Sequence, residues 1–146
     1  MEYNLKQYTN DDYEFMYNTK KNAYKKYVEE NWGLWDEKFQ RELFDKFISD
    51  NYDNVYIIEI NNENIGFYNG LILENGDYEI SNICIIQKYQ NRGIGTQVLK
   101  DILDKHIDKN IRLQYFKQNP VGNLYERLGF IKKGETDYHF QMIKYK

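Results

Sequence analysis

Two closely spaced glycines, Gly93 and Gly95, stand at a point where the chain could bind an anion. They follow an apolar strand pattern and open an amphipathic helix pattern that runs from about residue 94 to about residue 107. The first amides of a helix lack intrahelical partners, and the helix dipole adds positive potential there, so a phosphate group is favoured. Glycine also lets the backbone approach a ligand closely. The segment 90–95 therefore predicts a pyrophosphate site, although two spaced glycines are also typical of a simple tight turn.

The spacing of this segment departs from the two commonest nucleotide-binding loops. A dinucleotide fingerprint needs a third Gly or Ala, where this chain has Val98. An ATP-binding P-loop needs a lysine before its Ser or Thr, and Thr96 directly follows Gly95. Another kind of cofactor is therefore favoured, and a nucleotide-binding domain is the weaker alternative.

The thiol and imidazole groups offer little further chemistry. Cys84 is the only cysteine, so we expect a small buried residue without a disulfide. The two histidines, His106 and His139, lack the acidic spacing of a metal site, and we expect no bound metal. We place His106 on an exposed flank of its helix.

The elements that must position the loop follow from periodicity and turn signals. We expect one α/β domain over residues 1–146, with helices between strands in its second half. On the second helix, residues that recur every fourth position predict a core stripe: Trp35, Phe39, Leu43 and Phe47. The predicted strands are 3–8, 55–60, 65–73, 78–86, 111–116, 130–133 and 138–145, and the predicted helices are 11–30, 36–49, 94–107 and 121–128.

Composition narrows the class of protein. The net charge of −3 and the absence of a basic stripe argue against a nucleic-acid partner. No apolar run reaches membrane-spanning length, and the N-terminal residues do not resemble a signal peptide. We expect a soluble, cytoplasmic protein with no membrane partner.

Two separated motifs resemble the GNAT superfamily of N-acetyltransferases. The first is Gln90-x-x-Gly93-x-Gly95, and the second is the segment 119–130, which contains Leu-Tyr-Glu-Arg-Leu-Gly-Phe. The resemblance covers essentially the whole chain. It implies a GNAT fold: a mixed central sheet of about seven strands with a splayed central pair, flanked by about four helices. The chain departs from the family in two places, because Gln87 replaces a common proline and Asn119 lies six residues before Tyr125, where seven is frequent.

The resemblance also implies a cosubstrate, acetyl-CoA, and the residues that would bind it. Backbone groups of the strand before the loop would pair with the pantetheine arm, and the amides of the loop would hold the pyrophosphate. Asn119 would bond the arm, although it is equally suited to cap its own helix. The implied cofactor-binding residues are Ile83, Cys84, Ile85, Gln90, Asn91, Arg92, Gly93, Ile94, Gly95, Thr96 and Asn119.

Catalytic roles carry over at two positions. Glu79 lies where some family members place a catalytic base, and a solvated strand-edge carboxylate is its alternative. Tyr125 matches the tyrosine near the cofactor sulfur and would act as general acid, with core packing as the alternative. The implied reaction is direct transfer of acetyl to a primary amine of a small molecule or peptide. A non-catalytic acyl-CoA sensor is the competing function.

The acceptor site is predicted at the break between the first two helices. Trp32 and Trp35 would offer aromatic walls to an amine through cation–π contact, and core packing competes for Trp35. His139, in the last strand, is the third substrate-binding candidate, and a structural role competes there. A homodimer through the terminal strands is common among similar proteins, which leaves the oligomeric state open.

Overall fold

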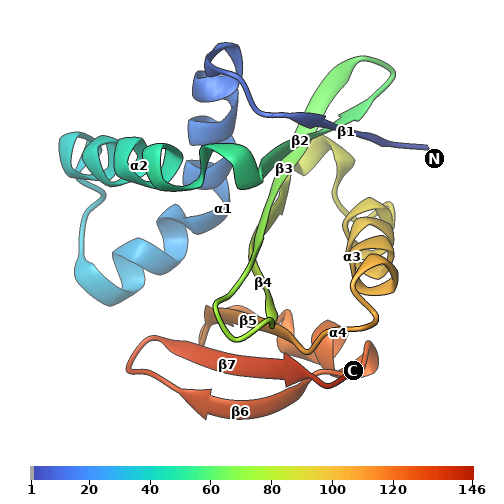
Figure 1. The fold of residues 1–146 in the computed structure, drawn as a ribbon. Coiled ribbons are helices and arrows are strands. Elements are labelled where there is room, and N and C mark those ends of the chain that lie inside the picture. The colour runs from blue at the N-terminus through green and yellow to red at the C-terminus, as the bar shows by residue number, and fades with distance from the viewer. Residues whose placement is uncertain (1) are drawn as a thin grey trace. The chain divides into compact units, whose positions relative to one another are not determined.

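The chain forms seven strands and four α-helices, which a computed structural model describes for residues 2–146 (Figure 1). Three short 3-10 helices lie at 10–12, 52–54 and 87–89. The strands are β1 (Asn4–Gln7), β2 (Val55–Ile60), β3 (Glu63–Ile72), β4 (Tyr78–Ile85), β5 (Ile111–Phe116), β6 (Ile131–Glu135) and β7 (His139–Lys144). The helices are α1 (Tyr13–Trp32), α2 (Glu37–Asn51), α3 (Ile94–Lys105) and α4 (Gly122–Arg127).

The strands follow one hydrogen-bonded order, β1-β2-β3-β4-β5-β7-β6. Strands β1 to β3 are antiparallel neighbours, as are β5, β7 and β6, whereas β4 and β5 are parallel. The predicted mixed α/β sheet is therefore confirmed, with each element within a few residues of its expected place.

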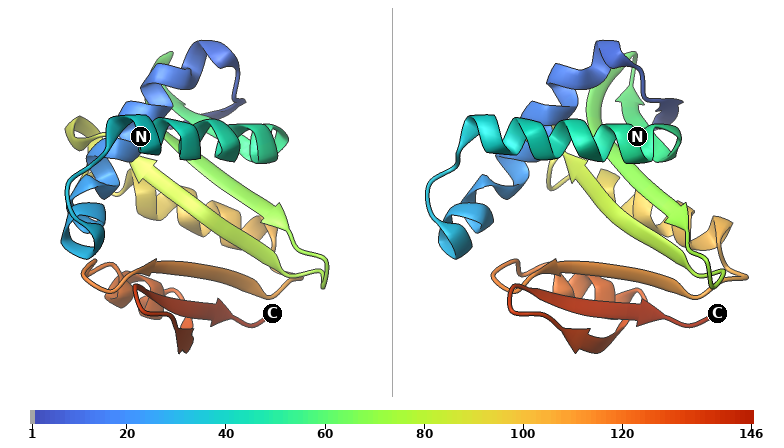
Figure 2. Two further views of the ribbon diagram at one scale, coloured as in Figure 1. Left: turned by 90° about the vertical axis from the view of Figure 1, so that its left-hand side faces the viewer. Right: turned by 60° about the vertical axis from the view of Figure 1, so that its left-hand side comes forward.

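The chain divides into two compact units, Met1–Asn69 with Asn82–Gly95, and Gly70–Ser81 with Thr96–Lys146. The single domain expected over residues 1–146 stays a prediction. In the first unit α1 and α2 cross one another (Figure 2) and share a core with β2, β3 and β4. That core is built from Tyr8, Met16, Tyr17, Phe44, Ile48, Val55, Ile57, Phe67 and Cys84.

The second unit contains α3, β5, α4, β6 and β7. Val98, Leu99, Ile102 and Leu103 are buried on α3, as its period predicts. Ile107, the last residue of the predicted helix 94–107, is 69% exposed, because α3 ends at Lys105.

The core stripe predicted for α2 is wrong at Phe39 and Leu43, whereas Trp35 and Phe47 do pack against the core. The buried residues are Phe44 and Ile48, while Phe39 and Leu43 are about half exposed, at 54% and 49%. Asp36 caps the helix by accepting the amide of Phe39 at 3.0 Å, and the face with Phe44 and Ile48 packs in the core with β2 and β3. Apolar residues on both stripes made the choice ambiguous from periodicity alone.

His106 also differs from its expected exposed position. It lies just after α3 and is half-buried, with its ring stacked on Tyr78 at a centroid distance of 3.7 Å. Burial lowers the pKa of this imidazole.

Candidate functional site

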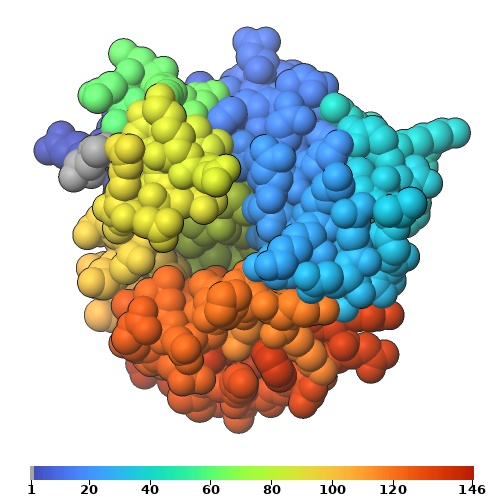
Figure 3. All heavy atoms as spheres, turned by 180° about the vertical axis from the view of Figure 1, so that it is seen from behind, coloured from blue at the N-terminus to red at the C-terminus, as the bar shows by residue number. Residues whose placement is uncertain are grey.

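The segment 90–95 forms an exposed loop that leads directly into α3. Asn91 and Gly93 both adopt positive φ, at 61° and 79°, so the chain turns sharply before the helix begins at Ile94. The surface around residues 87–93 is open to solvent (yellow in Figure 3). The loop thus presents the first turn of α3 to any ligand at this face.

The side chain of Gln90 fixes this loop to the strand before it. Its amide nitrogen donates to the carbonyl of Ile85 at 2.8 Å, and its backbone N–H donates to the carbonyl of Gln87 at 3.1 Å. The family motif's glutamine therefore holds the loop against the end of β4.

The two glycines are needed for different reasons. Gly93 has a left-handed φ of 79°, a backbone conformation that residues with a side chain adopt only with strain. Gly95 has no such need, and a Cβ added there would meet Ile85 at an ordinary 3.5 Å. A side chain at 95 would fit the fold, so the absence of one keeps room beside the loop.

Strand β4 has an incompletely paired backbone. Its parallel pairing with β5 covers Tyr78↔Ile111 and Glu79↔Arg112 and none of the residues 80–85. On the β3 side the approach is so close that a Cβ on Gly66 would lie 2.2 Å from the carbonyl oxygen of Cys84. Residues 83–85, the segment expected to pair with pantetheine, therefore carry backbone groups that β5 does not satisfy.

Cys84 is buried as predicted, at 4% exposure. Its thiol lies 3.5 Å from the hydroxyl of Tyr24, which also accepts from the amide of Asn82 at 3.1 Å. Burial raises the pKa of the thiol to about 11, so it is not a nucleophile near neutral pH.

Glu79, the expected base, lies near the start of β4 in the second unit. Its carboxylate accepts from the hydroxyl of Ser81 at 3.2 Å, and the side chain is half-buried. Its backbone is paired with that of Arg112.

The distal motif places Tyr125 on α4. Its ring lies 5.6 Å from that of Tyr115 and 5.8 Å from that of Phe130, and the side chain is half-buried. Asn119 accepts the amide of Val121 at 3.1 Å in a local turn before α4, whose N-cap is Val121 and not Asn119. Thr96 lies in the first turn of α3 and is half-buried.

The remaining substrate-binding candidates belong to different units, with Trp32 and Trp35 in the first and His139 in the second. His139 stacks on Phe116 at 4.5 Å in β7, and burial lowers its pKa. Trp32 is 52% exposed at the end of α1. Trp35 lines a pocket between α1 and α2, and Trp32 is not among the residues that line it.

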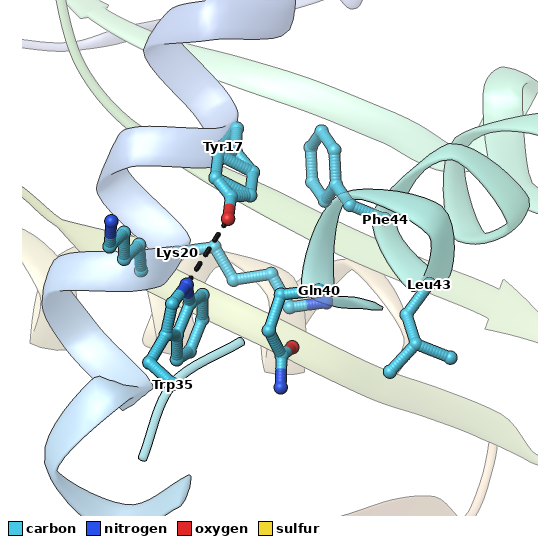
Figure 4. Close-up of a pocket in the computed structure, with 7 residues that line it drawn as sticks. Tyr17, Lys20, Trp35, Gln40, Leu43 and Phe44 are labelled. Atoms are coloured by element: carbon cyan, nitrogen blue, oxygen red, sulfur yellow. Dashed lines mark hydrogen bonds between the residues drawn. The ribbon is translucent and has the colours of Figure 1, made fainter. Parts of the chain in front are cut away.

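This pocket, of about 90 Å³ and open to solvent, is walled by both helices (Figure 4). Sequence reasoning missed most of its residues, because lysine, tyrosine and glutamine on a helix give no signal of a shared cavity. The lining residues are Tyr17, Lys20, Lys21, Trp35, Gln40, Leu43 and Phe44.

Comparison with known proteins identifies the family. Residues 12–130 match the sequence model described as the acetyltransferase (GNAT) family. The chain belongs to this family. Members of the GNAT family catalyse acyl transfer, and the predicted resemblance is confirmed. No curated protein matches the chain in sequence.

Solved structures show the same GNAT fold at low sequence identity. An acetyltransferase from Thermus thermophilus matches with a TM-score of 0.79 and 13% identity, covering 100% of this chain and 98% of that one. The PaiA N-acetyltransferase from Thermoplasma acidophilum, in complex with coenzyme A, matches with a TM-score of 0.72 and 19% identity over 100% of both chains. A GNAT acetyltransferase from Elizabethkingia anophelis with acetyl-CoA bound gives 0.59 and 24%, covering 72% and 82%.

Two further observations bear on this GNAT protein. Within residues 2–146, no three His, Cys, Asp or Glu side chains gather in a way that could hold a metal ion. None of the helices formed by those residues has the length and apolar character needed to cross a bilayer.

Proposed function

We propose that this protein is an acetyl-CoA-dependent N-acetyltransferase that acts on a primary amine of a small molecule or peptide. The observation that carries the proposal is the exposed loop 90–95, which turns at Gly93 into the first turn of α3 and leaves space at Gly95. Family membership supports it, as do the coenzyme A and acetyl-CoA named for the Thermoplasma and Elizabethkingia proteins.

The loop would bind the pyrophosphate of acetyl-CoA through the amides of residues 91–96. Arg92 would add positive charge, because no carboxylate of residues 2–146 lies within 4.0 Å of its guanidinium. The backbone groups of residues 83–85 that face away from β3, other than the Ile85 carbonyl bonded by Gln90, would accept the pantetheine arm much as a neighbouring strand would. The side-chain oxygen of Asn119 already accepts the backbone N–H of Val121. Its amide nitrogen would therefore be the group that bonds the pantetheine arm.

Acetyl-CoA supplies an activated thioester, and the protein must supply proton transfer. A primary ammonium has a pKa of about 10, so it must lose a proton before its nitrogen can attack. Glu79 would accept that proton directly or through water. The new N–C bond forms as the C–S bond breaks, and Tyr125 would return a proton to the leaving thiolate.

Direct attack is favoured over an acyl-cysteine route. Cys84 is the only thiol in the chain, and it is buried with its pKa raised to about 11. A thiol in that state forms too little thiolate to accept an acetyl group at neutral pH.

The deciding experiment is an amine-panel assay with acetyl-CoA that follows free thiol production. We expect Glu79→Gln and Tyr125→Phe to lower kcat by roughly 10²–10⁴-fold, the usual contribution of a general acid or base, with little change in CoA affinity by calorimetry. Exposed residues provide the matched controls Glu74→Gln and Tyr145→Phe, which should leave kcat unchanged. CoA binding without turnover of any amine would instead favour the acyl-CoA sensor.

A further inference from the structure

The pocket between α1 and α2 has aromatic walls whose faces are already occupied by the protein's own cations. The guanidinium of Arg41 lies 3.7 Å from the ring centroid of Tyr17, and the ammonium of Lys21 lies 5.8 Å from that of Trp35. Lys20 lies 5.7 Å from the ring of Phe44. An incoming ammonium would therefore meet positive charge at each of these rings.

Two of those cations are neutralised by carboxylates. Lys21 pairs with Glu37 at 2.9 Å, and Arg41 pairs with Glu14 at 2.8 Å and with Glu37 at 3.3 Å. Glu37 also accepts the indole N–H of Trp35 at 3.0 Å. These ion pairs use Glu14 and Glu37, while the carboxylate of Glu29 accepts the backbone N–H of Trp35 at 2.9 Å.

Lys20 is different, because it has no carboxylate partner. No carboxylate oxygen of residues 2–146 lies within 4.0 Å of its Nζ, which instead sits 4.5 Å from the ring centroid of Phe47. The side chain is half-buried, and burial lowers the pKa of its ammonium. A desolvated cation without a counter-ion is stabilised by any anion that enters the pocket.

The position of Lys20 connects this pocket to β4. Its ammonium is close enough to Cys84 for each group to perturb the pKa of the other. Cys84 belongs to the segment 83–85 whose backbone is proposed to bind the pantetheine arm. An anion held at Lys20 would thus lie on the same unit as that segment.

We propose that the α1–α2 pocket binds a carboxylate of the acetyl acceptor, with Lys20 as its counter-ion, so that the substrates are amines that also carry a carboxylate. This inference rests on the proposed acetyltransferase function. It assigns Lys20 a role in specificity and keeps the aromatic residues as the apolar wall around the substrate.

The first test compares matched acceptors, a panel of amino acids against the corresponding amino acid amides, with acetyl-CoA in the intact protein. The wild type should prefer the carboxylate form. Lys20→Met should lower kcat/KM for it by roughly ten- to hundredfold, as expected for a lost charge-assisted hydrogen bond, and leave the amide form unchanged. Lys20→Arg should retain the preference, and the exposed Lys25→Met on the same helix should behave as wild type.

A second test measures binding without catalysis. In a Trp32→Phe background Trp35 is the only tryptophan, so its fluorescence reports on the pocket. The same amino acids, but not their amides, should change this fluorescence, and Lys20→Met should abolish the change. The proposal would be overturned by a preference for amides or by a carboxylate preference that survives Lys20→Met. It would also be overturned if no carboxylate gave a fluorescence change that depends on Lys20. Failure of CoA to bind in calorimetry would instead refute the proposed function, whatever the fluorescence shows.

Discussion

Single residues near the proposed site are held in states that restrict which chemistry each can perform. The side chain of Gln90 donates a hydrogen bond to the carbonyl of Ile85, and that of Asn119 accepts one from the backbone N–H of Val121. The thiol of Cys84 is buried beside the hydroxyl of Tyr24. What remains available is backbone at the loop and on β4, and an unpaired charge at Lys20. These are groups for binding, and in the proposed function the proton transfers fall to Glu79 and Tyr125.

The Cys84 thiol should resist alkylation in the folded protein. A pKa raised to about 11 from 9.0 lowers the thiolate fraction at pH 8 by roughly 100-fold, and burial blocks the reagent further. We expect iodoacetamide labelling, followed by mass spectrometry, to be at least that much slower in native protein than in protein unfolded with guanidinium. Equal rates would show that β4 is not buried as described.

The loop and the helix pair each depend on a small number of interactions between elements. The loop depends on a left-handed turn before α3, and the helix pair depends on ion pairs that join α1 to α2. Substitutions in the loop and at the α1–α2 ion pairs can therefore distinguish effects on the free energy of unfolding from effects on ligand affinity.

Replacing the two loop glycines should give opposite results. Gly93→Ala places a side chain at φ of +79° and should lower the free energy of unfolding by about 1–2 kcal/mol. Gly95→Ala should leave stability nearly unchanged, because its Cβ has ordinary contacts, and should weaken CoA binding by filling the space kept for phosphate. Urea denaturation and calorimetry measure the two effects, and equal CoA affinity of Gly95→Ala and wild type would contradict the loop's role.

Glu37 should make the helix pair sensitive to acid. Its pKa is lowered to about 2, first by its bond to Lys21, from an ordinary 4.5. Since the folded pKa is depressed, the stabilisation is fully present above about pH 4.5 and is lost as pH falls toward 2. Glu37→Gln should therefore lower Tm at pH 7 and lose this effect progressively below pH 4.5; the exposed Glu42→Gln serves as control.

For the molecule as a whole, a bound ligand should be visible as thermal stabilisation. At about 100 times its Kd, a ligand that binds the native state alone adds about 2.7 kcal/mol, which for a protein of this size raises Tm by roughly 5–10 °C. Coenzyme A and acetyl-CoA should produce this shift in a thermal-melt assay, and ATP and NAD should not. A shift with ATP instead would point to nucleotide binding.

The order of elements and the loop could be predicted because their signals are local. Gly93 and Gly95 stand between a strand and a helix in the sequence itself, and strand alternation locates β2 to β4. The buried face of α2 could not be predicted, since Phe39 and Phe44 are equally apolar and only the contact with the sheet selects between them. The environment of Lys20 likewise depends on Phe44 and Phe47, which lie more than twenty residues away in the chain.

The carboxylate of Glu37 forms ion pairs with Lys21 and Arg41 and also accepts the indole N–H of Trp35. A single substitution there would release Lys21 beside the pocket, while Arg41 would keep its pair with Glu14 and Lys20 would be untouched. Selection could then shift acceptor preference toward more highly charged acids, such as dicarboxylates, in one step and without rebuilding either helix. The range of metabolites open to descendants of this protein would thus be governed by an anion on the rim of the pocket.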